Sequence, residues 1–194
     1  MPNRPTGLFF GSFNPVHTGH MILANFMATQ TKLEEVWMVV SPQNPFKQQK
    51  TLARDHDRLH LVELAIGNTP RLRASRVEFG MPKPSYTVDT LAVLRERHPE
   101  REFALIMGSD NLETLPKWKN AQVILRDFDV HVYLRPNHPG GELAAHPRVH
   151  LYEAPLMQLS ATYVRRCVRE GQSIRYLVPE AVAVEIERSG LYRS

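Results

Sequence analysis

Short, almost continuous apolar runs alternate along the chain with longer segments whose apolar residues recur at helical spacing. The first run is Thr6 to Phe10, which Gly11 ends, and the second is Val36 to Val40. Uninterrupted apolar runs of this length are typical of strands that are buried on both faces of a sheet. Further strands are expected over Leu72 to Val77, Phe103 to Met107, Val130 to Leu134 and Val149 to Tyr152.

The segments between these runs predict helices. Thr18 is expected to cap a helix over His20 to Gln30, because a hydroxyl can accept from the first free amides of a helix. The remaining helices are expected over Arg54 to Ile66, Thr87 to Arg97, Asn120 to Leu125, Ala161 to Arg169 and Pro179 to Arg188. Strands that alternate with helices indicate a doubly wound, Rossmann-like α/β fold, in which a parallel sheet has helices on both faces.

The 194 residues are expected to form one domain, with residues 160–194 as a small C-terminal helical segment. The segment from Pro136 to Pro147 is rich in proline and glycine and is expected to be an exposed insertion. In doubly wound folds, ligands bind beyond the carboxyl ends of the strands. The loops that start at Gly11, Ser41, Gly108 and Arg135 all leave such ends.

Composition and charge narrow the class of protein. The hydrophobic content of 42% is that of an ordinary globular protein. The sequence contains no run of about eighteen apolar residues, so a membrane-spanning helix is not expected. The single cysteine, Cys167, cannot form an internal disulfide and is expected to pack in the interior, so a cytoplasmic location is expected. The net charge of +4 comes from basic residues interleaved with acids, which suits a small phosphate-bearing ligand and predicts no nucleic-acid partner.

The segment GSFNPVHTGH, from Gly11 to His20, carries the most chemical information. Gly11 permits an unusual backbone angle and a close approach to a ligand, and the amides at the following helix start form an anion site. His17 and His20 are three residues apart, so both imidazoles can face one ligand and donate to phosphate oxygens, with added charge if they are protonated. Two alternatives stay open, namely that the histidines bind a metal, or that they lie on the surface beside a tight turn.

A second segment, LSATYVR from Leu159 to Arg165, begins one of the expected helices. Ser160 can cap this helix, while the hydroxyl of Thr162 and the guanidinium of Arg165 can bind an anion. Most serines at helix starts are simple caps, so this segment gains weight only when it is taken together with GSFNPVHTGH.

These two segments resemble the signature motifs of the nucleotidylyltransferase superfamily, which has a T/HxGH motif after its first strand and an I-S-x-T-x-[IV]-R segment downstream. Within it, the chain is similar to the bacterial nicotinate-nucleotide adenylyltransferases. Four more segments carry this resemblance, in the family's order: SYTVDTL at 85–91, GSDN at 108–111, LPKWK at 115–119 and YLVP at 176–179. The chain departs from the family at Phe46, where a histidine is common, and at Ala161, where a serine is common.

The resemblance implies a role for each matching position. His17, His20 and Arg165 would be catalytic. The ATP-binding residues would be Gly11, Ser12, Phe13, His17, Gly19, His20, Gly108, Asp110, Ser160, Thr162 and Arg165. The substrate-binding residues would be Lys47, Tyr86, Thr87, Asp110, Trp118, Lys119 and Arg135.

Among the residues of the second substrate, Trp118 would stack on a flat pyridinium ring, and backbone amides near Thr87 and Lys119 would receive its carboxylate. Trp118 lies between two lysines, so a partly exposed position is expected, although a core position is the alternative. Asp110 would bind a ribose hydroxyl or cap a helix. Lys47 would bind the mononucleotide phosphate or remain solvated, and Arg135 would lie on the adenosine side.

The resemblance further implies the transfer of AMP from ATP to nicotinate mononucleotide, which gives nicotinate adenine dinucleotide and pyrophosphate in NAD biosynthesis. Mg²⁺ would come with ATP, and no metal site is expected in the protein itself. No membrane partner is expected, and whether the chain forms a homo-oligomer stays open. The alternatives are another transferase of the superfamily, such as the phosphopantetheine enzyme, and a nucleotide-sensing module without turnover.

Overall fold

The computed structural model describes residues 4–42 and 52–193, and its centre is a parallel sheet of six strands. The strand order is β3-β2-β1-β4-β5-β6, and every adjacent pair is parallel. The strands are β1 (Arg4–Gly11), β2 (Glu35–Val40), β3 (Leu72–Ser75), β4 (Arg101–Gly108), β5 (Asp129–Tyr133) and β6 (Val149–Tyr152). The order reverses between β1 and β4, which is the point at which doubly wound folds bind ligands.

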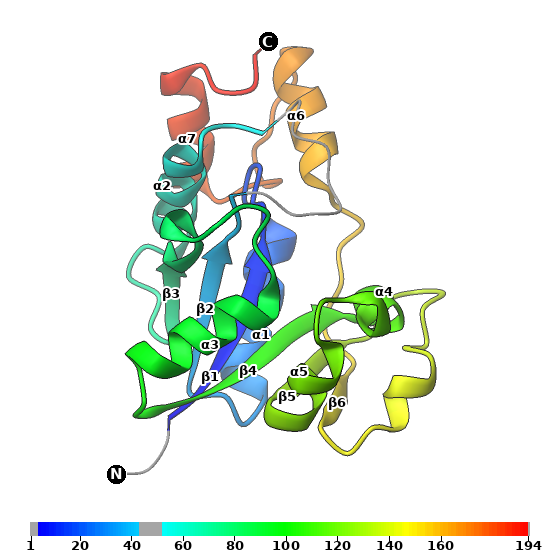
Figure 1. Ribbon diagram of the computed structural model, residues 1–194. Coiled ribbons are helices and arrows are strands. Elements are labelled where there is room, and N and C mark those ends of the chain that lie inside the picture. Colours follow the sequence, from blue (N-terminus) through cyan, green and yellow to red (C-terminus); the bar gives the residue numbers. More distant parts are fainter. Residues whose placement is uncertain (1–3, 43–51, 194) are drawn as a thin grey trace.

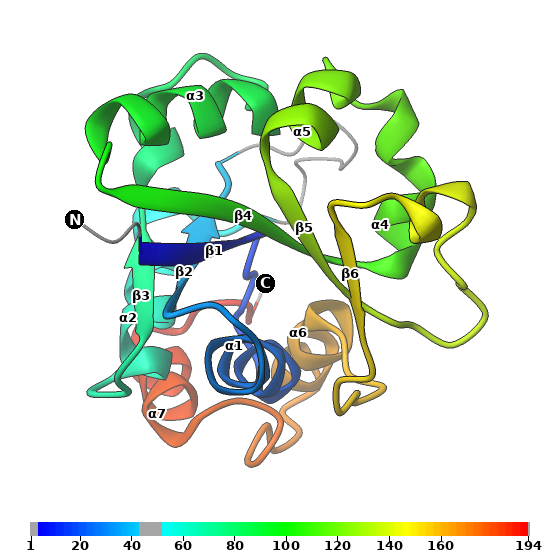
Figure 2. The ribbon, with the colours of Figure 1, turned by 90° about the horizontal axis from the view of Figure 1, so that it is seen from below.

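Helices cover both faces of the sheet (Figure 2). One face carries α1 (Thr18–Gln30), α2 (Asp55–Ile66) and α7 (Glu180–Ser189), and the other carries α3 (Thr87–Arg97) and α5 (Ala121–Asp127). Successive residues of β1 serve opposite faces, because Leu8 belongs to the core cluster with Leu91 while Phe9 belongs to the cluster with Met27. The expected doubly wound α/β fold is therefore confirmed.

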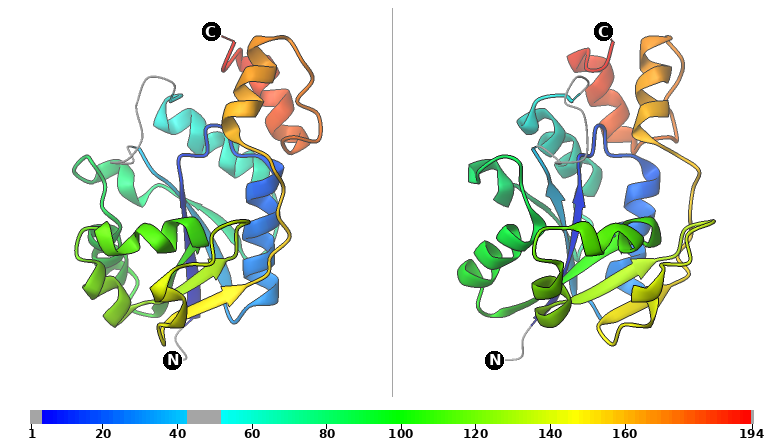
Figure 3. Two further views of the ribbon diagram at one scale, coloured as in Figure 1. Left: turned by 90° about the vertical axis from the view of Figure 1, so that its right-hand side faces the viewer. Right: turned by 45° about the vertical axis from the view of Figure 1, so that its right-hand side comes forward.

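The C-terminal helices lie at the carboxyl edge of the sheet. Figure 1 shows α6 (Ala161–Arg169) and α7 beyond the end of β1. The chain reaches α6 from β6 through a long extended segment that runs beside α1 (Figure 3). Cys167 of α6 is buried, as expected from the sequence. Within the described residues, no helix is long and apolar enough to cross a membrane.

Three local expectations were wrong. His17, and not Thr18, is the N-cap of α1. β3 ends at Ser75, because the backbone turns at Arg76 and the apolar Val77 begins a 3₁₀ helix, η1 (Val77–Gly80). The chain after Gly108 is not a loop but α4 (Ser109–Thr114), followed by η2 (Leu115–Lys117). α4 has few apolar positions, so it shows no helical periodicity in the sequence.

The segment from Pro136 to Pro147 is mostly exposed, as expected, and contains η3 (Glu142–Ala145). It is nevertheless attached to α4 through Glu113. One Glu113 carboxylate oxygen lies 2.8 Å from His138 Nδ1, and the other accepts from the backbone N–H of Gly140 at 3.2 Å. These contacts fix the insertion beside the carboxyl ends of β4 and β5.

Candidate functional site

His17 and His20 cap the start of α1 reciprocally. The backbone N–H of His20 donates to Nδ1 of His17 at 3.4 Å, and the backbone N–H of His17 donates to Nδ1 of His20 at 3.2 Å. This is the arrangement of a capping box, with imidazoles in place of the usual serine and glutamate. The two rings stack 3.6 Å apart. Gly19, which lies between the two histidines in the sequence, is buried. A β-carbon at this position would lie 3.2 Å from the His17 ring.

The capping box also fixes the protons of the two histidines. A neutral imidazole whose Nδ1 accepts a hydrogen bond carries its proton on Nε2. Burial lowers the pKa of His17 to about 4, so this ring is neutral near pH 7. His17 therefore presents a neutral Nε2–H group near pH 7 and carries no positive charge there.

Gly11 leaves room for the Phe13 side chain. Gly11 ends β1 in extended backbone, and a β-carbon on it would lie 2.7 Å from the Phe13 ring. The unusual backbone angle belongs to Phe13, at φ +41°. Phe13 is buried, and its ring packs edge-on against the ring of His20 with centroids 5.0 Å apart. The expectation of strained backbone at Gly11 was wrong, because the glycine makes room for a side chain that supports His20.

α6 brings Arg165 to this loop. Nη1 of Arg165 donates to the carbonyl of Asn14 at 2.7 Å, and Nη2 donates to the Thr162 hydroxyl at 3.3 Å. Nε of Arg165 is buried and has no hydrogen-bond partner in the described part of the chain. Partial burial lowers the pKa of Arg165, although a guanidinium stays charged. Ser160 caps α6, as the sequence predicted, by accepting from the N–H of Tyr163 at 3.2 Å.

Asp110 and Arg135 form an ion pair beyond β4 and β5. The distance from Arg135 Nη1 to Asp110 Oδ2 is 2.9 Å, and Oδ1 of Asp110 is buried without a partner among the described residues. A β-carbon at Gly108 would overlap that Oδ1, so a side chain there would displace the Asp110 carboxylate. Asp110 lies in the first turn of α4 and makes no side-chain cap there, which excludes the capping alternative.

A cavity of about 530 Å³ opens between the strand ends and α3. Its walls combine apolar strand residues such as Phe9 and Ile106 with Trp118 and the start of α3. Trp118 is half-buried at the end of η2, as expected from its flanking lysines. Thr87 is the first residue of α3, whose first backbone N–H groups have no partner within the helix. The cavity thus offers an aromatic face and the backbone N–H groups at the very start of α3.

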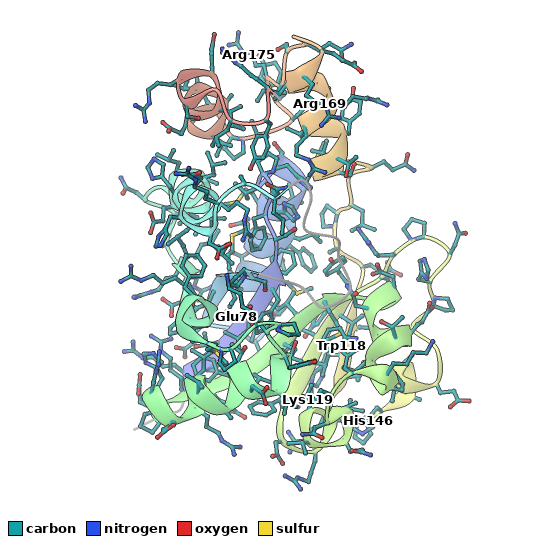
Figure 4. All side chains as sticks on the ribbon, turned by 45° about the horizontal axis from the view of Figure 1, so that its top comes forward. Glu78, Trp118, Lys119, His146, Arg169 and Arg175 are labelled. Carbon is teal, nitrogen blue, oxygen red and sulfur yellow. The ribbon has the colours of Figure 1, made fainter. Side chains whose placement is uncertain are left out.

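Tyr86 and Lys119 lie at the mouth of this cavity. Nζ of Lys119 is 2.7 Å from an Asp89 carboxylate oxygen and 4.7 Å from the centre of the Tyr86 ring. The side chain of Lys119 is therefore bound to Asp89 of α3. The backbone of Lys119 is the part of this residue that can bind a ligand. Figure 4 labels Trp118 and Lys119 together with Glu78, which lines the same cavity.

Sequence reasoning missed Glu78. This carboxylate is buried below the cavity, where Oε1 accepts from the Thr90 hydroxyl at 2.8 Å and Oε2 has no direct hydrogen bond among the described residues. Burial raises the pKa of Glu78, and the hydroxyls of Thr90, Ser41 and Ser85 oppose that rise. Glu78 therefore connects η1 to the first turn of α3. A lone acidic residue near a Gly/Pro-rich loop gives no signal of burial.

A second hollow of about 470 Å³ lies beside Arg135. Besides Arg135 and His138, it is lined by residues of the extended segment that leads to α6, including Met157 and Ser160. Met157 also lies near Gly19, so this hollow adjoins the start of α1. Two positions discussed from the sequence, Phe46 and Lys47, lie outside the described residues.

Metal binding by His17 and His20 finds no support in their surroundings. Both Nδ1 atoms accept hydrogen bonds from the backbone, and the described residues contain no group of three or more His, Cys, Asp or Glu side chains that could hold a metal ion. The structure thus brings together the two sequence motifs, one from each end of the chain, beside a cavity with an aromatic wall.

Comparison with known proteins shows the family to which this chain belongs. Residues 8–167 match a family described as cytidylyltransferase-like. A probable nicotinate-nucleotide adenylyltransferase of Cytophaga hutchinsonii is 51% identical over 176 residues, which cover 91% of this chain and 92% of the relative. The chain belongs to this family of adenylyltransferases. A relative with the same description from Bacteroides fragilis is 43% identical, and the alignment covers 94% of this chain and 90% of the relative.

A solved structure shares the fold at much lower sequence similarity. The Plasmodium falciparum nicotinic acid mononucleotide adenylyltransferase, in complex with NaAD, superposes with a TM-score of 0.81 at 20% identity. The superposition covers 98% of both chains. The family assignment therefore rests on the sequence relatives, and the structural match confirms the Rossmann-like arrangement.

Proposed function

We propose that this protein transfers AMP from ATP to nicotinate mononucleotide, which gives nicotinate adenine dinucleotide and pyrophosphate. The observation that supports this proposal is that two candidate ligand sites meet at one edge of the sheet. The His17–His20 pair and Arg165 lie over the end of β1, and the cavity with Trp118 begins at Phe9, whose ring is 6.2 Å from that of His20.

In the proposed arrangement, ATP occupies the side of α1 and α6. Its phosphates face the start of α1, where His17, His20 and the first amides of the helix donate, while Arg165, Ser160 and Thr162 bind from α6. The hollow beside Arg135 suits the adenosine. Asp110 suits a ribose hydroxyl, because its Oδ1 has no hydrogen-bond partner among the residues that the structure describes. These roles follow the family resemblance, and the contacts of the described residues support them.

Nicotinate mononucleotide would occupy the cavity. The pyridinium ring would stack on Trp118, since an indole face attracts a flat cation. The carboxylate would accept from the free amides at Thr87 and from the backbone of Lys119, near the positive end of the α3 dipole. Lys47 would bind the mononucleotide phosphate.

The chemistry needs no general base, because a phosphate monoester is already ionised and nucleophilic near neutral pH. Its oxygen attacks the α-phosphorus of ATP in line, and the bond to pyrophosphate breaks. The protein contributes orientation and hydrogen bonds to the negative charge that grows on the transferred phosphate. His17 would contribute as a neutral donor, and Arg165 would contribute a fixed positive charge beside it. Mg²⁺ carried by ATP would neutralise further phosphate charge, which fits the lack of a carboxylate cluster in the described chain.

The proposal is tested by incubating the protein with ATP and a panel of acceptors, and by measuring pyrophosphate and the dinucleotide product. We expect rapid release with nicotinate mononucleotide and little with 4′-phosphopantetheine, which has no ring to stack on Trp118. Faster turnover of phosphopantetheine would favour the related superfamily enzyme. ATP binding without pyrophosphate release from any acceptor would favour a nucleotide-sensing module.

A further inference from the structure

Arg58 is a fully buried residue of α2. Its guanidinium donates from all three nitrogens. Nε donates to the carbonyl of Ala53 at 3.1 Å, and Nη2 lies 2.8 Å from an Asp55 carboxylate oxygen. Nη1 donates to two carbonyls at once, those of Ser12 and of Ser41, the latter at 3.0 Å.

The two carbonyls lie beside different proposed substrate sites. Ser12 lies in the loop after β1 that leads to His17, on the side proposed for ATP. Ser41 follows β2 and lines the cavity proposed for the acceptor. The same nitrogen of Arg58 therefore holds the ends of two adjacent strands together. Ala53 adds a parallel connection, because its backbone N–H donates to the Asn14 side chain at 3.1 Å.

We propose that Arg58 is a positioning residue that sets the spacing between the ATP site and the acceptor site. This inference rests on the proposed function, in which a phosphate oxygen from one site attacks a phosphorus in the other. Such a reaction depends on the relative position of the two reactants far more than on the affinity for either. The planar, forked guanidinium reaches several carbonyls in fixed directions, whereas a lysine ammonium at the same position keeps the charge but not the fork.

The test compares Arg58→Lys with wild type in three measurements: kcat with both substrates saturating, the binding of each ligand alone by calorimetry, and thermal unfolding. The two ligands are a non-reactive ATP analogue and nicotinate mononucleotide. We expect kcat to fall by about a hundredfold, the effect of misplacing reacting groups by roughly 1 Å, while each separate affinity changes much less. Damage to either site alone would instead weaken the binding of that ligand.

Arg71→Lys is the control. Arg71 also donates from its guanidinium to a main-chain carbonyl, that of Ala28 at 2.9 Å, but at the end of α1 far from the site. We expect this variant to keep the wild-type kcat. A folded Arg58→Lys protein with near-normal kcat, or with lost affinity at unchanged kcat, would overturn the inference.

If Arg58→Lys does not fold, Asp55→Ala decides, because it removes one partner of the guanidinium and leaves the carbonyls in place. We expect a smaller fall in kcat with both affinities retained, and an unchanged kcat would count against the proposal. Failure of wild type to form any dinucleotide would refute the proposed function instead.

Discussion

The Nδ1 atoms of His17 and His20 are both used inside the protein, so only Nε2 of each ring carries a proton for donation. The fold and the proposed catalysis thus depend on different atoms of the same side chain. Asparagine at position 17 can place its amide oxygen where Nδ1 lies, and so keep the cap, but it has no group at the position of Nε2. This separation gives a direct test of the role of His17.

We predict that His17→Asn keeps most of the wild-type stability and loses about a hundredfold or more in kcat, the typical cost of removing one donor to a transition-state charge. His17→Ala should lose similar activity and, in addition, about 1 kcal/mol of stability, because the cap is gone. Urea unfolding and steady-state kinetics on both variants measure the two effects. Near-normal turnover in His17→Asn would contradict the donor role.

Trp118 is expected to supply affinity without supplying selectivity. Nicotinate and nicotinamide mononucleotides both have a pyridinium ring, so stacking on an indole cannot distinguish them. Trp118→Ala should therefore raise KM for both acceptors and leave most of the preference for the acid. Measuring kcat/KM for both acceptors tests this, and a preference that collapses in the variant would show that Trp118 itself selects.

At the scale of elements, the start of α3 is the part of the cavity that carries free amides, and its position depends on the hydrogen bond from Thr90 to Glu78. Thr90→Val removes the hydroxyl at nearly constant volume and leaves the buried Glu78 carboxylate without the hydrogen bond from Thr90. We predict a loss of about 1–3 kcal/mol in the free energy of unfolding. Thr90→Ser keeps the hydroxyl and serves as the control. Equal stability of the two variants in denaturant titrations would show that this bond is not needed.

The elements were predictable where a strong pattern of apolar residues existed. β1, β2 and β4 are almost continuously apolar, and α1 and α3 carry regular apolar positions, so their bounds differ little from expectation. α4 has too few apolar residues for a period to appear, and Val77 continued a strand pattern although the backbone had already turned. The local sequence shows the periodicity of apolar residues, but it does not show where the backbone changes direction.

The candidate site was predictable only in part. GSFNPVHTGH and LSATYVR identified groups that the fold brings together, as the bond from Arg165 to Asn14 shows. Glu78 and Arg58 gave no signal, because their importance comes from burial and from partners elsewhere in the chain. The carbonyl of Ser12, for example, is 46 residues from Arg58 in sequence. A charged residue in an amphipathic pattern looks solvated until its partners are known.

At the scale of the whole molecule, two buried histidines make stability depend on pH. Burial lowers the pKa of His17 and of His131 to about 4, from an ordinary value of 6.5. Below pH 6.5 the unfolded chain binds protons that the folded chain does not, so the free energy of unfolding falls as pH decreases from 6.5 towards 4. We predict a slope of up to about 1.4 kcal/mol per pH unit for each histidine.

Denaturant titrations across this range measure the slope. His131→Asn should make it shallower, because asparagine does not titrate and can still accept a hydrogen bond from the Tyr152 hydroxyl, which lies 3.0 Å from His131 Nδ1. A wild-type stability that is constant between pH 6.5 and 4 would contradict the neutral state assigned to His17.

We propose that the molecule joins AMP to an acceptor that carries a carboxylate. The most direct measurement is the ratio of kcat/KM for nicotinate mononucleotide to that for its amide, with wild-type protein and saturating ATP. Amide donors near Thr87 would meet the donor of a carboxamide, and unpaired buried groups of that kind cost about 1–3 kcal/mol each. We predict a ratio of about ten or more in favour of the acid, since 1.4 kcal/mol corresponds to tenfold. Equal efficiency for the two acceptors would contradict the account.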